Sequence, residues 1–133
     1  MTKAAELAKI GEVATNSQIG GRRNIIINGA MKVAQRGTSV TGIGASAGYF
    51  TCDRWNINTG SSAGRLTMTQ TADGPVGFAN CIKLDCTTAD TSIAAGENLI
   101  LQQSFEGQDL QAIGKGVTGA KEVTLSFYVK ANA

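Results

Sequence analysis

The chain has 133 residues, of which only 17% are charged and 5% aromatic, while 17 are glycine. This mixture is typical of short strands joined by glycine-rich turns, and the length suits one domain. The net charge of +2 argues against a nucleic-acid surface. The sequence contains no run of about eighteen apolar residues, so no transmembrane helix is predicted. Because histidine is absent, catalytic triads with a histidine base are excluded within the chain.

The first residues lack the continuous apolar core of a secretory signal, so we expect folding in a cytoplasm. Cys52, Cys81 and Cys86 are odd in number and lack the close paired spacing of a zinc site. We interpret them as reduced, buried, small hydrophobic side chains. No dense acidic loop suggests calcium either, so the sequence predicts no metal and no cofactor.

Residues 1–17 are predicted to form a short helix with Thr2 at its start. An apolar stripe on this helix comprises Leu7, Ile10 and Ala14. A helix this short has marginal stability on its own. Its apolar stripe therefore needs a partner, which can be other copies of the chain, a socket on another protein, or the chain's own β-domain. Residues 18–23 are interpreted as a linker, in which Ile19, Arg22 and Arg23 either meet a partner or remain in solvent.

Residues 24–37 are the expected junction between this leading segment and a β-domain. Three consecutive isoleucines favour an extended backbone, and Asn28-Gly29 signals a turn with positive φ angles. Residues 30–34 are predicted to be extended again, before a second break at residues 35–37. Residues 38–48 are predicted to be a flexible glycine-rich loop.

Residues 49–57 gather the first aromatic cluster, and two readings remain open there. A continuous strand would separate Cys52 from Trp55 on opposite faces, whereas a turn near Asp53 would bring both inward.

Four further segments alternate between apolar and polar residues, as half-buried strands do. They span residues 65–71, 80–86, 97–106 and 122–130. Six or seven short strands without a long helix between them predict a mainly β, antiparallel, jelly-roll-like β-sandwich over residues 24–133. Because the chain ends just after its clearest strand, we expect later residues or other subunits to complete the sheet.

The first of two characteristic blocks is Arg-Asn-Ile-Ile-Ile-Asn-Gly-Ala-Met-Lys-Val-Ala-Gln-Arg-Gly-Thr-Ser at residues 23–39, followed by Cys-Asp-Arg-Trp at 52–55. It resembles the N-terminal region of bacteriophage tail fibre proteins, most closely those of marine and cyanobacterial phages. The second block, residues 101–106 and 123–131, resembles later strands of jelly-roll carbohydrate-binding modules.

The resemblance implies a structural virion protein, the proximal part of a homotrimeric tail fibre assembled in the host cytoplasm. Its N-terminal part would attach to a tail adaptor, nozzle or baseplate protein, through Leu7, Ile10, Val13, Ala14, Ile19, Arg22 and Arg23. Distal regions of such a fibre would meet host surface glycans; no nucleic acid, membrane insertion or catalysis is implied.

A carbohydrate-binding module is the alternative function, with candidate contacts at Tyr49, Arg54, Trp55 and Tyr128 and flanking groups Asp53, Gln102 and Gln103. A lone tryptophan in a small β-domain is more often a core residue, and Arg54 beside Asp53 suggests an internal ion pair or a turn contact. An enzyme would need paired carboxylates; the available ones, Asp53, Asp73, Asp85, Glu97, Glu106 and Asp109, lie in no recognisable catalytic context.

Overall fold

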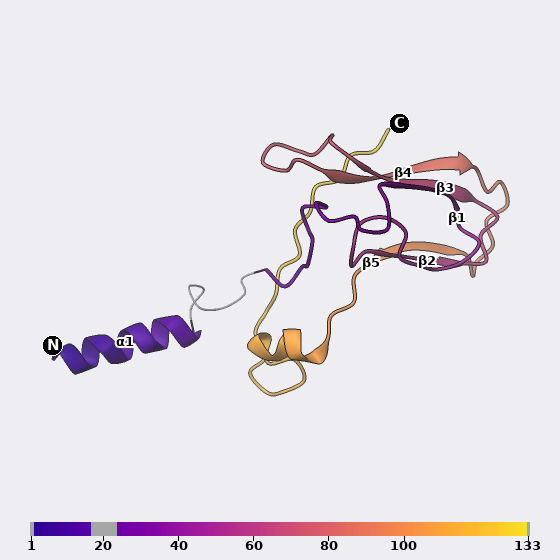
Figure 1. Cartoon of the computed structure of the whole chain (residues 1–133). Coiled ribbons are helices and arrows are strands. Elements are labelled where there is room, and N and C mark those ends of the chain that lie inside the picture. The colour runs from indigo at the N-terminus through magenta and orange to yellow at the C-terminus, as the bar shows by residue number, and fades with distance from the viewer. Residues whose placement is uncertain (1, 17–23, 133) are drawn as a thin grey trace. The chain divides into compact units, whose positions relative to one another are not determined.

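The computed structural model describes residues 2–16 and 24–132, with side chains of the first segment described as far as Lys9 (Figure 1). All five strands belong to one compact unit, residues 26–104 together with 128–132, which we call the β-body. The N-terminal helix and residues 105–127 lie outside that unit.

The N-terminal helix α1 spans Lys3–Asn16, within the predicted range. The Thr2 carbonyl oxygen accepts the Ala5 and Glu6 amides at 2.9 and 3.2 Å, which starts the helix. All described side chains from Thr2 to Lys9 are exposed. The helix therefore gains little from burial over these residues.

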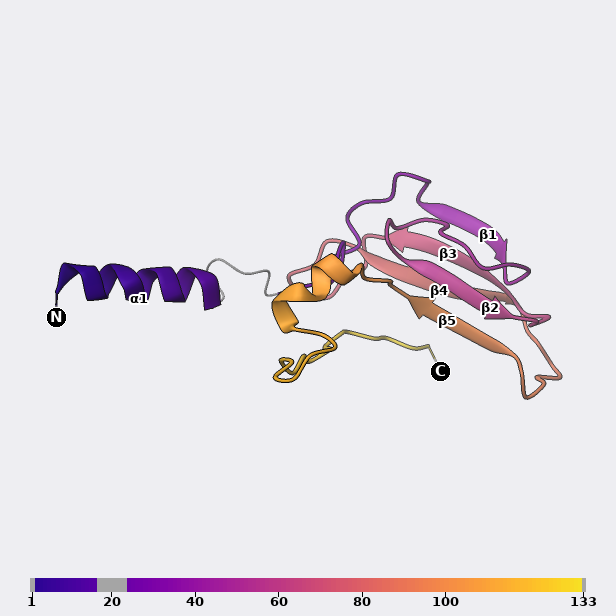
Figure 2. The same ribbon diagram turned by 90° about the horizontal axis from the view of Figure 1, so that it is seen from below.

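The β-body has two antiparallel sheets, and the remaining regular element is the 3-10 helix η1. One sheet has the order β1-β3-β4 and the other pairs β2 with β5. The bounds are β1 Ser39–Ile43, β2 Asn56–Gly60, β3 Arg65–Thr71, β4 Cys81–Thr88, β5 Asn98–Gln102 and η1 Gly107–Ile113. In Figures 1 and 2 the two sheets form two layers. The expected mainly β, antiparallel architecture is thus confirmed and is consistent with a β-sandwich, while the jelly-roll connection stays a prediction.

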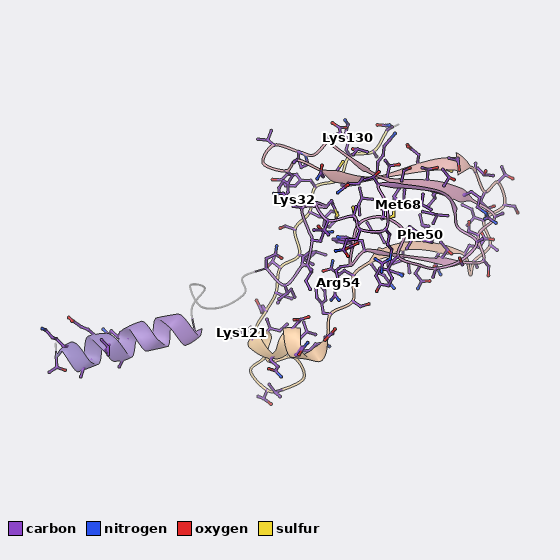
Figure 3. The ribbon with its side chains drawn as sticks, viewed as in Figure 1. Lys32, Phe50, Arg54, Met68, Lys121 and Lys130 are labelled. Atoms are coloured by element: carbon purple, nitrogen blue, oxygen red, sulfur yellow. The ribbon has the colours of Figure 1, made fainter. Side chains whose placement is uncertain are left out.

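The core lies between the two sheets, where Met68 and Phe50 are labelled in Figure 3. Ile43, Ile57 and Met68 are buried and come from β1, β2 and β3. The side chains packed against them are Val40, Phe50, Trp55, Leu66 and Ile82. The alternation predicted for residues 65–71 is therefore confirmed, because Leu66 and Met68 both face this core.

Two predictions of local structure are wrong, and each error has a physical reason. Residues 39–43, predicted as loop, form β1 because they pair with β3, with a register shift between Val40 and Ile43. Residues 30–34, predicted to be extended, form no ladder and lie between turns at residues 27–30 and 35–36. Residues 122–130, the clearest strand by pattern, form no ladder in the described chain because a strand needs a hydrogen-bonding partner outside its own segment.

Candidate functional site

The Asn28-Gly29 signal marks a tight turn at the start of the β-body. Asn28 has a φ of 56°, and its backbone oxygen accepts the Met31 amide at 3.1 Å. Met31 also has a positive φ, 53°. Asparagine tolerates this left-handed conformation because its short polar side chain bonds locally. The expected positive φ is confirmed at Asn28.

The Asn28 side chain joins two distant segments. Its Nδ2 donates to the backbone oxygens of Val33 at 2.8 Å and Asp53 at 3.0 Å. Its Oδ1 accepts the Val33 amide at 3.0 Å, and the Asp53 amide donates to the Val33 oxygen at 2.9 Å. One side chain thus satisfies three backbone groups that no strand ladder pairs.

A second turn carries the Asp-Arg-Trp segment. The Trp55 amide donates to the Cys52 oxygen at 3.3 Å, and Arg54 has a φ of 73°. Cys52 is fully buried, and Trp55 packs partly buried against the core. The reading with a turn near Asp53 is therefore confirmed, as is the interpretation of Trp55 as a core residue.

Asp53 is held by the segment that follows the first turn. Its Oδ1 accepts the Gln35 amide at 3.2 Å and lies 3.5 Å from the Arg36 guanidinium. Arg36 also lies over the Tyr49 ring, 5.6 Å from its centroid. Of the two interpretations of Arg54, an ion pair with Asp53 or a turn contact, the ion pair does not form: Arg36 lies beside the Asp53 carboxylate, and Arg54 donates to the Ser104 oxygen at 3.3 Å.

The residues of the resembling motif therefore meet in one place, which we call the Asn28 cluster. It comprises Asn28, Val33, Gln35, Arg36, Asp53 and Trp55. Its polar groups point at one another and at backbone atoms. Groups satisfied in this way stabilise a fold, and they leave few free donors or acceptors for a ligand.

Two further contacts of this region were not predicted from the sequence. The Gln103 side-chain amide accepts the Ile27 amide at 2.8 Å and donates to the Ile27 oxygen at 2.7 Å, as a neighbouring strand would. The Met31 oxygen accepts Gln70 Nε2 and the Cys52 thiol. No periodicity in the sequence signals these long-range contacts.

The four candidate glycan contacts do not converge. Trp55 is part of the Asn28 cluster, Tyr49 lies under the Arg36 guanidinium of that cluster, and Arg54 donates to the Ser104 oxygen. Tyr128 is 76% exposed and lies against Phe78, with ring centroids 5.9 Å apart. Tyr128 therefore packs against the loop between β3 and β4. Lys130 pairs with Asp73 of the same loop at 3.5 Å.

The predicted attachment residues fall largely outside what the structure describes. Leu7 is 73% exposed on α1. Ile10, Val13 and Ala14 lie on α1, but their side chains are not among those described, and Ile19, Arg22 and Arg23 lie outside the described residues.

The three cysteines are free, but only Cys52 is buried, so the expectation of three buried thiols is wrong for Cys86, which is exposed, and for the half-buried Cys81. Burial raises the pKa of the Cys52 thiol above its usual value. Within residues 2–16 and 24–132, no three cysteine or acidic side chains gather where they could share a metal ion. None of the helices in the described residues has the length and apolarity that crossing a bilayer requires.

Comparisons of the chain with protein-family models, with curated proteins and with solved structures found no match in any of the three.

Proposed function

We propose that this chain is a structural virion protein, the proximal part of a homotrimeric bacteriophage tail fibre. The observation that carries the proposal is the Asn28 cluster. The residues by which the sequence resembles tail fibres are the ones that interlock the first turn with the Asp-Arg-Trp turn. The role of that motif is then to build a rigid support, which is the task of a fibre.

Self-association is supported by the apolar surface that one copy leaves uncovered. Seventeen large apolar side chains are exposed among the described residues, and exposed apolar patches that are contiguous mark interaction sites. The most exposed of them on the chain's extended C-terminal segment are Val123, Leu125, Phe127, Tyr128 and Val129, between 61% and 81% exposed. Neighbouring copies would cover such surface in a closed oligomer.

Attachment to the tail is assigned to the leading segment. Helix α1 exposes all its described side chains, including Leu7, so a socket on a tail adaptor, nozzle or baseplate protein would cover its apolar stripe. A weakly stable helix that orders on docking suits this role. Contact with host glycans would come from distal regions of the fibre.

Chemical cross-linking of the purified chain tests the proposal. With a lysine-reactive reagent at low protein concentration, the ladder of products is expected to stop at three chains, and the same reaction in denaturant should give one chain. A single-chain product under native conditions would contradict the proposal.

A glycan array tests the carbohydrate-binding alternative, which the exposed Tyr49 and Tyr128 rings favour. Binding that disappears in Tyr128→Ala or Tyr49→Ala, with the fold intact, would support that alternative. A silent array is the result expected from the structural role.

A further inference from the structure

Strand β5 presents an unprotected apolar edge. It pairs with β2 along one edge, and no other strand of the described chain pairs with its second edge. Leu99, Ile100 and Leu101 are 47%, 44% and 39% exposed, and β5 contains no charged residue. Edge strands usually carry charges, proline or bulges that discourage pairing, so this edge is open to an added strand.

In the other sheet, the edge strand β4 carries charged side chains. There Lys83 and Asp85 form an ion pair of 2.8 Å. Charged side chains on an edge strand discourage another strand from joining, because pairing would desolvate them. Of these two edges, β5 is the better acceptor.

The face of β5 that turns toward the core is only half covered. In the ladder with β2, Leu101 lies opposite Ile57 and Leu99 opposite Thr59. Residues directly opposite in an antiparallel pair share a face, so both leucines lie on the face of the buried Ile57. A strand beyond β5 would extend that face and cover both leucines, and it would widen a two-stranded sheet, which is marginal alone.

The chain also contains a segment that has the sequence pattern of a strand but pairs with no sheet. Residues 121–132 form no ladder and are exposed throughout. Val123, Leu125, Phe127 and Val129 alternate with polar residues and Tyr128, so an added strand would present one continuous apolar face. The contacts of this segment with Phe78 and Asp73 involve exposed side chains, and exposed pairs contribute little.

We propose that residues 124–128 of one copy add as an antiparallel strand to β5 of a second copy. Leu125 then lies opposite Leu101, and Phe127 opposite Leu99. A shift of one residue would turn both apolar side chains to the outer face, and a shift of two would leave one of them opposite Gln103 or Glu97. Every ladder in the β-body is antiparallel, as is this one.

The register also places no like charges opposite each other. Lys121 lies opposite Phe105, Glu122 opposite Ser104 and Val129 opposite Glu97. The pairing therefore meets no direct charge repulsion across the two strands.

Such an arrangement is compatible with a closed ring of the three copies proposed above. Each chain has one donor segment and one acceptor edge, which are different surfaces, so the contact is head-to-tail and can close into a ring. The inference rests on the proposed self-association and names the contact that would produce it.

Chains with a single accessible cysteine test the contact. Two chains with different affinity tags are co-expressed, one with Leu99→Cys and the other with Phe127→Cys, both in a Cys81→Ser, Cys86→Ser background. The buried Cys52 stays in place. Since neither chain can cross-link within itself, a product that carries both tags after treatment with a short bis-maleimide reports the contact between copies.

Leu84→Cys replaces Leu99→Cys in the control. Leu84 lies on the edge strand β4, opposite the buried Met68, and is 36% exposed, so the two positions match in residue type, exposure and face. We expect about tenfold more two-tag product at Leu99 than at Leu84, because a short cross-link needs the two side chains within a few ångströms.

Two results would overturn the inference. Suppose that lysine cross-linking gives products of up to three chains, while the Leu84→Cys chain yields as much two-tag product as the Leu99→Cys chain. The proposed contact is then wrong and the proposed function stands. If no two-tag product forms and the ladder stays at one chain, the contact and the proposed function both fail.

Discussion

The indole Nε1 of Trp55 donates a hydrogen bond to the backbone oxygen of Asn28 at 3.1 Å, across 27 positions of sequence. That oxygen also accepts the Met31 amide, so one carbonyl fixes both the first turn and the tryptophan that packs against the core. The bond ties residues 23–39 to the Asp-Arg-Trp segment, and it uses a ring N–H donor that phenylalanine and tyrosine lack.

Trp55→Phe keeps a ring at the core and removes the indole donor. We expect the free energy of unfolding in urea, followed by circular dichroism, to fall by about 1 kcal/mol, because the Asn28 oxygen keeps its second donor. Tyr128→Phe, which changes an exposed ring, is the control and should stay within about 0.5 kcal/mol of the parent. An unchanged stability of Trp55→Phe would show that the bond contributes nothing.

Asn28 combines a left-handed backbone with three side-chain hydrogen bonds, and two substitutions separate these contributions. Asn28→Gly removes the hydrogen bonds and keeps a residue suited to a φ of 56°. Asn28→Ala removes the bonds and adds backbone strain, so it should be less stable than Asn28→Gly by about 1 kcal/mol. Thermal or urea unfolding of both variants measures the difference; an alanine variant at least as stable as the glycine variant would contradict the account.

This turn also shows how far sequence reasoning reaches. The Asn-Gly pair predicted a positive φ, because that preference is local. The partners of Asn28 at Val33 and Asp53 were not predicted, since contacts across a turn and between loops leave no periodic trace in the sequence. For the same reason the sequence suggests Arg54, the neighbour of Asp53, as one possible ion-pair partner and gives no sign of Arg36.

Strand prediction succeeded where alternation and pairing coincide. Residues 65–71 form β3 over the whole predicted range, because this central strand has partners on both sides. Residues 39–43 were missed because Ser-Val-Thr-Gly-Ile has too few apolar residues to show a pattern, and its strand character comes from β3. Residues 122–130 show the reverse case, a clear pattern with no ladder among the described residues.

The thiols should react with a disulfide reagent in the order of their exposure. Cys86 is exposed and reacts first, the half-buried Cys81 follows, and Cys52 reacts only when the core opens. Burial raises the pKa of Cys52 and so lowers its thiolate fraction at neutral pH. We expect Cys52 to react at least about a hundredfold more slowly than Cys86, because opening of the core limits it.

In the same experiment the Cys52→Ala variant should lack the slow labelling phase, which would assign that phase to Cys52. If Cys52 were labelled as fast as Cys86 in the folded chain, its burial against the Asn28 cluster would be wrong.

Asp90 makes stability depend on pH in the acid range. The Ser92 and Ala63 amides donate to its carboxylate at 3.0 and 2.9 Å and hold its pKa below the ordinary value. A depressed pKa in the folded state stabilises the fold above the unfolded pKa of about 4, and this stabilisation is lost as pH falls through the folded value.

Urea unfolding between neutral and acid pH checks this sign. In Asp90→Asn the acid-induced loss should be smaller than in the parent. Asp73→Asn, at a carboxylate with 79% side-chain exposure, is the control for removing a surface charge. An acid dependence unchanged by Asp90→Asn would contradict the role of the two amides.

Sedimentation equilibrium of the unmodified chain over a range of concentrations tests most directly whether this β-body is built to be completed by other copies. The account predicts a limiting mass three times the chain's 13.7 kDa, with dissociation only on dilution. A mass of one chain at every concentration would contradict it.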